Sequence, residues 1–311
     1  MKTISNILVF VDPTATEHPA VEKAALIASR SGARIELYAC ETKDSRAMRY
    51  SAHLAKGGPI EFITHLRAVV EEVAKPLSGR GLDVCVEVTS GDPLHVQLLE
   101  RAQHTKADLV IKDTHHHSLA KRTFITNTDW HLIRGCPVPL LLTKAKRWTE
   151  PTVVVAAVDP SHVNDKPASL DHEVLQAAHV LAGATHGSVH AVHAYLPIAL
   201  SAEVATGMPV IMSAMTPKMM EEERVAALEQ VQTLCKPFRI DSQHASVKLG
   251  VPSDVIPNFA EEVDADVVVM GAISRSGLAR LFIGSTAERV LETLPCDVLV
   301  IKPADLPASL I

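Results

Sequence analysis

Short apolar runs alternate with longer amphipathic runs along the whole chain. The clearest apolar run, at 267–270, has three β-branched residues and ends at Gly271, which is typical of a buried strand in a parallel sheet covered on both faces. The longer runs repeat their apolar positions with the helical period. The pattern therefore predicts an α/β fold of parallel strands and covering helices. Strands are expected near 5–11, 33–39, 82–88, 107–112, 138–143, 152–158, 188–194, 243–248, 266–270 and 297–301.

The two halves of the chain repeat one pattern. A strand ending in Val-Asp-Pro occurs at 11–13 and at 158–160, and an apolar run introduced by Ala-Asp occurs at 107–111 and at 265–269. Self-similarity on this scale predicts two copies of one domain. We expect the domains to span 1–145 and 151–311. The linker at 146–151 is short, so the two domains should pack tightly against each other.

Three motifs together resemble the universal stress protein family. They are the strand ending in Val-Asp-Pro, a Gly-x-Pro turn before the third helix, and Ala-Asp-Val-Val-Val-Met-Gly followed after twelve residues by Gly-Ser. The resemblance covers nearly the whole chain twice, as in the tandem-domain type of this family. It implies two Rossmann-like domains (flavodoxin-like or adenine-nucleotide-hydrolase-like), each with five parallel strands, and a role in stress tolerance. The family dimerises, so two fused copies could form an intramolecular pseudo-dimer or a homodimer.

Some members of the family bind ATP through the motif Gly-x2-Gly-x9-Gly-[Ser/Thr]. The second copy matches it at Gly271 and Gly284-Ser285, and departs at Ser274, where the motif has glycine. If that glycine needs positive φ, a serine costs on the order of 1–2 kcal/mol, which weakens binding roughly tenfold without abolishing it. Independently of the resemblance, Gly284-Ser285 opens a helix, whose free N–H groups and positive dipole end favour a phosphate.

The resemblance implies the rest of the nucleotide site. The carboxylate at the end of the first strand would meet the ribose or the adenine, strand ends would line the base and sugar, and the helix start would hold the phosphates, with Mg²⁺ accompanying ATP. The predicted nucleotide-binding residues are Ala157, Asp159, Ala194, Met270, Gly271, Ser274, Gly284, Ser285 and Thr286.

The first copy lacks the motif. Asp113, His116, Thr126 and Asn127 stand at its four positions, so both glycines around the turn are gone and Asp113 would repel a phosphate. We therefore expect no ATP binding in residues 1–145.

These signals also have structural interpretations, which stay open. Ser285-x-x-Glu288 is the pattern of a capping box, which stabilises a helix start without any ligand, and Thr126-x-x-Asp129 resembles it in the first copy. An aspartate before proline, as at 12 and 159, often hydrogen-bonds its own turn.

A histidine-rich loop follows the fourth strand of the first copy, at the sheet edge where ligands of such folds usually bind. Imidazoles gathered there could hold Zn²⁺. The sequence has no ordered spacing such as His-Glu-x-x-His, so a polar loop is the favoured interpretation and zinc the alternative. The candidate ligands are His115, His116, His117 and His131, with His95 near the same edge.

The extra residues of the second copy include an apolar segment at 196–215 with one charged residue, Glu203. Its prolines and glycine exclude a continuous membrane-spanning helix. We interpret it as a lid on the core, with a wall for a hydrophobic small molecule as the alternative, because methionine-rich surfaces adapt to varied ligands. The candidate residues for such a ligand are Leu196, Ile198, Leu200, Met208, Ile211, Met212 and Met215.

Composition narrows the function further. The net charge of −6 argues against a nucleic-acid partner, and five scattered cysteines without Cys-x-x-Cys spacing are typical of reduced cytoplasmic protein. No apolar run is long enough to span a bilayer, so we expect a cytoplasmic protein. There is no Gly-x-Ser-x-Gly elbow and no Gly-x4-Gly-Lys-[Ser/Thr] loop, so we assign no catalytic residue. Slow ATP hydrolysis and a carrier or interaction role remain the alternatives to nucleotide binding alone.

Overall fold

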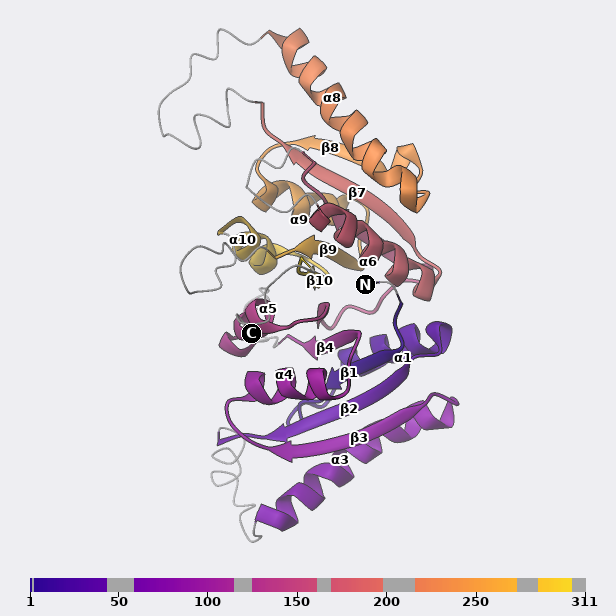
Figure 1. The fold of residues 1–311 in the computed structure, drawn as a ribbon, viewed down its shortest axis with the longest axis vertical. Helices are drawn as coiled ribbons and strands as arrows, with labels where there is room; N and C mark the ends of the chain where they lie inside the picture. Colours follow the sequence, from indigo (N-terminus) through magenta and orange to yellow (C-terminus); the bar gives the residue numbers. More distant parts are fainter. Residues whose placement is uncertain are drawn as a thin grey trace.

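The computed structural model describes residues 1, 3–43, 59–114, 125–160, 169–197, 216–272 and 285–303. Ten strands form one sheet in the order β3-β2-β1-β4-β5-β10-β9-β6-β7-β8, with the two halves of the chain stacked along the long axis (Figure 1). The strands are β1 (Asn6–Phe10), β2 (Arg34–Glu41), β3 (Val84–Ser90), β4 (Leu109–Asp113), β5 (Leu140–Thr143), β6 (Val153–Ala157), β7 (Ser188–Tyr195), β8 (Ala245–Leu249), β9 (Val267–Gly271) and β10 (Asp297–Ile301). All ten predicted strands are present, with bounds shifted by a few residues.

Each half is a parallel five-stranded unit with the same strand order. β1 lies between β2 and β4, and β6 lies between β7 and β9, all in parallel. The chain moves outward from the first strand of each half, then returns to its other side for the fourth strand. The fold class predicted from the sequence is therefore confirmed, and each half has a switch point between its first and fourth strands.

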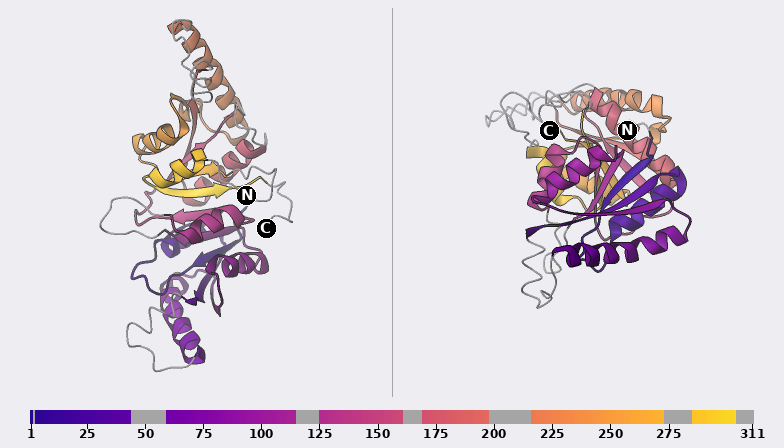
Figure 2. Two further views of the ribbon diagram at one scale, coloured as in Figure 1. Left: turned by 90° about the vertical axis from the view of Figure 1, so that its left-hand side faces the viewer. Right: turned by 60° about the horizontal axis from the view of Figure 1, so that its bottom comes forward.

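Helices cover both faces of the sheet (Figure 2). Alternate strand residues point to opposite faces, so Val267 and Val269 pack in one core cluster while Val268 and Met270 pack in the other. The helices on the first face are α1 (Pro19–Ser31), α3 (Pro59–Gly79), α6 (Ser169–Thr185) and α8 (Pro217–Cys235), with the short η2 (Lys236–Phe238) and η3 (Ser242–His244) after α8. Those on the second face are α4 (Leu94–His104), α5 (Asn127–Gly135), α9 (Pro252–Glu262) and α10 (Ser285–Thr293).

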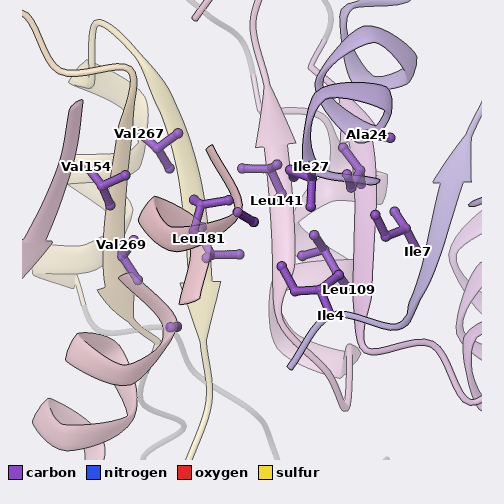
Figure 3. Packing of buried hydrophobic residues seen from close by; sticks show 14 of the residues in the cluster. Ile4, Ile7, Ala24, Ile27, Leu109, Leu141, Val154, Leu181, Val267 and Val269 are labelled. Atoms are coloured by element: carbon purple, nitrogen blue, oxygen red, sulfur yellow. The ribbon is translucent and has the colours of Figure 1, made fainter. Parts of the chain in front are cut away.

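The two halves join through their last strands. β5 and β10 pair antiparallel, with Leu141 opposite Leu299, so the sheet and one core cluster continue from one half into the other (Figure 3). The tight packing expected from the short linker is observed. Because β5 and β10 run in opposite directions, the carboxyl ends of β4 and β9 lie at opposite edges of the sheet beside this junction. The two switch points are therefore separate sites.

A buried ion pair crosses the junction. Nζ of Lys23, on α1, lies 2.7 Å from Oδ2 of Asp297, at the start of β10, and both side chains are at most 5% exposed. The same carboxylate accepts from the backbone N–H of Lys144 and from Nε1 of Trp148, each at 2.7 Å. Burial nevertheless raises the pKa of Asp297 to about 6. The charge on each partner is therefore tolerated largely because the other is present.

The repeated Ala-Asp motif has a structural role. Oδ2 of Asp108 accepts from the backbone N–H groups of Ser5 and Asn6, at 2.8 and 2.9 Å. Oδ2 of Asp266 accepts from the backbone N–H of Val153 at 2.9 Å. Each aspartate therefore ties the start of the fourth strand to the start of the first strand in its half. Among the described residues, no helix combines the length and the apolar character needed to cross a membrane.

Candidate functional site

The switch point of the second half gathers residues predicted for the nucleotide site. Ala157, the last residue of β6, lies opposite Met270 of β9 in the parallel register. Ala157 and Ala194 pack against the core cluster that contains Met270, and Ala287 of α10 packs against the same cluster. The structure therefore brings the ends of β6, β7 and β9 together with the first turn of α10, at the edge where ligands bind in folds of this class.

Asp159 lies two residues beyond β6, with its side chain 26% exposed. Its backbone N–H donates to Oδ1 of Asp171, on α6, at 3.0 Å. Its carboxylate Oδ1 lies 3.9 Å from Nδ1 of His193, which is buried on β7. Asp159 is therefore partly open to solvent and held between two elements.

Its counterpart in the first half, Asp12, makes a local turn. Oδ1 of Asp12 accepts from the backbone N–H and the hydroxyl of Thr14, at 2.9 and 2.7 Å. This is the local turn that the structural interpretation predicts for an aspartate before proline. For Asp12 that interpretation is confirmed. Asp159 has described contacts with β7 and α6, and Ser161, which stands at the position of Thr14, lies outside the described part of the chain.

Sequence reasoning missed His193. The sequence feature that could have indicated it is a histidine directly before Ala194, because the corresponding position of the first half is Ala39. A lone histidine in an apolar strand usually reads as a core residue, and only the contact across strands shows that it faces the end of β6.

Gly271 has a packing reason to be glycine. A Cβ built on it would lie 2.5 Å from Cδ2 of Leu170, in the first turn of α6. Leu170 is 2% exposed and belongs to the core, so it has little room to move. Because Gly271 has no side chain, Leu170 and the first turn of α6 can pack against it. A ligand could contact this residue only through its backbone.

We expect Gly271→Ala to lower the free energy of unfolding by about 1–3 kcal/mol, because the added methyl overpacks against Leu170. Urea unfolding of the variant, of Leu170→Ala and of the double variant measures this. The double variant should lose less stability than the two single losses added together, because removing the leucine makes room for the methyl. Additive losses would show that the two residues do not compete for space.

Different side chains occupy the helix starts at the two switch points. In the first half, Thr126 caps α5 and forms the expected capping box. Its hydroxyl accepts from the N–H of Asp129 at 3.2 Å, and Oδ2 of Asp129 accepts from the N–H of Thr126 at 2.8 Å. Oδ1 of Asp129 lies 2.8 Å from Nζ of Lys112, and both side chains are at most 3% exposed. Side chains of the chain itself therefore occupy the start of α5, and Lys112 balances the charge of Asp129.

In the second half the corresponding residues carry no charge. The gapless alignment of the two Ala-Asp runs places Ala287 at the position of Asp129 and Met270 at that of Lys112. α10 begins at Ser285, so this serine is the first helical residue and the third is Ala287. α10 thus lacks a carboxylate at its third residue, where α5 has Asp129. The acidic residue in its first turn is Glu288, whose side chain is 41% exposed and lies 4.0 Å from the guanidinium of Arg134. The side chain of Ser285, which the expected capping box with Glu288 requires, lies outside the described part of the chain.

Asp113 fills the position of Gly271 in the first half. Its Oδ1 accepts from the backbone N–H of Ala20, in the first turn of α1, at 2.8 Å and from the hydroxyl of Thr143 at 2.6 Å. Burial raises the pKa of this carboxyl. The carboxylate of Asp113 therefore ties the end of β4 to α1 and β5.

Several predicted residues lie outside the described part of the chain. For Ser285 and Thr286 only the helical backbone is described, and Leu196 is half-buried just beyond β7. The residues outside are Ser274, Gly284, His115, His116, His117, Ile198, Leu200, Met208, Ile211, Met212 and Met215.

The zinc hypothesis gains no support from the residues that are described. His131 stacks on His95, with ring centroids 4.1 Å apart and planes at 8°, so their nitrogens lie in parallel planes and do not converge on one ion. Burial, together with the charge of His131, lowers the pKa of His95. Within the described ranges, no three His, Cys, Asp or Glu side chains gather closely enough to hold a metal.

Comparisons with known proteins agree with this architecture. The family described as the universal stress protein family matches residues 3–144 and again 152–302. Universal stress protein E of Salmonella typhi is 31% identical over 97% of this chain and 96% of that protein. Its namesake in Escherichia coli K12 is 29% identical over 97% and 95%. A putative universal stress protein from Pseudomonas aeruginosa UCBPP-PA14 superposes with a TM-score of 0.75 at 27% identity, covering 99% of this chain and 97% of that one. The chain therefore belongs to the universal stress protein family and carries its domain twice.

Proposed function

We propose that the second half binds an adenine nucleotide, ATP, at the carboxyl edge of β6 and β9, and that the first half does not. The base and ribose would lie along the ends of β6, β7 and β9, near Ala157, Ala194 and Asp159. The phosphates would lie at the first turn of α10. As family membership implies, the bound nucleotide would serve a stress response, as a signal or a stored ligand.

The contrast between the two helix starts carries this proposal. A helix N-terminus presents unpaired N–H groups and a partial positive charge. In the first half, the side chains of Thr126 and Asp129 occupy this end, and Lys112 balances the charge of Asp129. In the second half, Ala287 and Met270 stand at the positions of Asp129 and Lys112, and the carboxylate of Glu288 is exposed and lies near Arg134, which supports an anion from solution as the complement of this helix start.

The position in the fold supports the same assignment. Open parallel sheets bind ligands at the switch point, and here Ala157 and Met270 lie side by side at that point. We assign no catalytic residue, because the residues proposed to hold the phosphates and the sugar include no identified base to activate water. A shorter universal stress protein has been solved in complex with cAMP, but it overlaps 49% of this chain at a TM-score of 0.30, and its ligand is not carried over.

Equilibrium dialysis of the full chain with labelled ATP, with and without Mg²⁺, tests the proposal. We expect saturation at one ATP per chain, and weaker retention of labelled GTP as the matched control for the base. Two ATP per chain would overturn the asymmetry between the halves. Absence of retained ATP under both conditions would overturn nucleotide binding altogether.

A further inference from the structure

Among the described residues, three hydrogen bonds hold the segment that leaves β6. The backbone N–H of Val158 donates to the carbonyl of Val192 at 3.0 Å, which continues the ladder with β7. Nδ1 of His193 lies 3.1 Å from the carbonyl oxygen of Val158. The backbone N–H of Asp159 donates to Oδ1 of Asp171 at 3.0 Å. Two of the three partners are side chains, so the conformation at Asp159 depends on them.

The imidazole of His193 is held in one tautomer. The carbonyl oxygen of Val158 only accepts, so Nδ1 of His193 must carry the proton in this hydrogen bond. His193 is 5% exposed, and so its ring is held by packing as well as by the hydrogen bond. The carboxylate of Asp159 stands 3.9 Å from the same nitrogen. The ring therefore fixes the backbone before Asp159 and lies beside its carboxylate.

The first half keeps the backbone bond and lacks the side chain. The N–H of Val11 donates to the carbonyl of Tyr38 at 2.8 Å, as Val158 does to Val192. The residue after Tyr38 is Ala39, which has no donor to place on the end of the first strand. There Asp12 folds back onto Thr14. His193 therefore occurs only in the half whose first strand leads to Asp159, and the two side chains lie beside each other there.

We propose that His193 is a positioning residue of the nucleotide site. By donating from Nδ1 to the carbonyl of Val158, it fixes the turn so that the carboxylate of Asp159 points at the ligand and accepts from a ribose hydroxyl. This inference rests on the proposed function, and it names the residue that selects a ribose over a deoxyribose. The recognition is therefore of a ribonucleotide, through its sugar hydroxyls.

Competition dialysis tests this with ATP, 2′-deoxy-ATP and 3′-deoxy-ATP on the full chain. We expect the wild type to prefer ATP over at least one deoxy analogue by about tenfold, the effect of one hydrogen bond to a charged acceptor. His193→Leu removes the donor at similar volume and should bring this ratio close to one. His193→Asn places an amide nitrogen where Nδ1 was and should keep most of the preference.

Thermal unfolding of each variant shows whether it folds like the wild type. Loss of the preference in both variants, or in neither, would overturn the role of the Nδ1 hydrogen bond, as would a wild type that binds ATP and both deoxy analogues equally. A wild type that binds no ATP would instead overturn the proposed function, and this inference with it. The two failures are therefore distinguishable.

Discussion

Replacing Lys23 with methionine is expected to lower the free energy of unfolding by about 3–5 kcal/mol at pH 7. The substitution leaves the carboxylate of Asp297 buried at 1% exposure without the cation that lies 2.7 Å away. It also removes the hydrogen bond from Nζ of Lys23 to the carbonyl of Lys144. Urea unfolding at pH 7 measures the loss.

The cost of this substitution should shrink as the pH falls from 7 to 5. The pKa of Asp297 is about 6 in the folded chain, against an ordinary value of 3.8, because burial outweighs its favourable contacts. A carboxyl whose folded pKa is raised adds stability when protonated and loses that contribution as the pH rises through the folded pKa. Lys23 is the largest influence lowering this pKa, so without it the pKa rises further. At pH 5 the carboxyl of the variant is neutral, and mainly the lost hydrogen bond remains.

Two comparisons isolate the buried charge. Adding Asp297→Asn to Lys23→Met should restore much of the stability at pH 7, because no unpaired charge is left inside. Lys146→Met is the matched control. Its partner Asp264 is 79% exposed, so the loss should be about 1 kcal/mol or less and independent of pH between 5 and 7. A cost for Lys23→Met that stays constant over this range would contradict the account of Asp297.

Ala287→Asp is expected to weaken ATP binding by about a hundredfold or more. It places a carboxylate at the third residue of α10, where Asp129 stands in α5. Against a phosphate about 4 Å away, at an effective dielectric constant of 20, one negative charge costs about 4 kcal/mol, and each 1.4 kcal/mol is tenfold in affinity. Isothermal titration calorimetry with ATP measures the change.

Stability and charge controls separate repulsion from damage. Ala287 is partly buried against the core cluster that contains Met270, so Ala287→Asp should lower the free energy of unfolding, and the favourable effect of a carboxylate near a helix N-terminus, about 0.3–1 kcal/mol, offsets only part of that loss. Urea unfolding of each variant measures the loss and shows that the protein titrated with ATP is folded. Ala287→Asn has nearly the same size without the charge and should keep most of the ATP affinity. Equal affinity of the two variants for ATP would contradict the position of the phosphates at α10.

Much of the fold was predictable because it follows from local patterns. Buried strands such as β9 are continuous apolar runs, and Gly32 ends α1 at a φ of 70° as a left-handed cap. Pro59 and Pro217 lie in the first turns of α3 and α8, as expected for a residue without an N–H to donate. The repeat itself required no structure, since two copies of one sequence pattern fold alike.

The candidate site was predictable only in part. Motif spacing led to Met270 and Gly271, and the structure brings Met270 opposite Ala157. Motif spacing could not show that Gly271 makes room for Leu170, because Leu170 is distant in the sequence. His193 was missed for the same reason, since its partner Val158 directly follows another strand, β6.

By itself the sequence determined two copies of an α/β domain, their family and the asymmetry of their phosphate motifs, because periodicity, glycine positions and helix caps are properties of neighbouring residues. Only the tertiary structure decided that the halves share one sheet through β5 and β10, that Lys23 and Asp297 close the junction, and that His193 faces the end of β6. These contacts join residues far apart along the chain. They depend on burial and strand pairing, and the spacing of neighbouring residues determines neither.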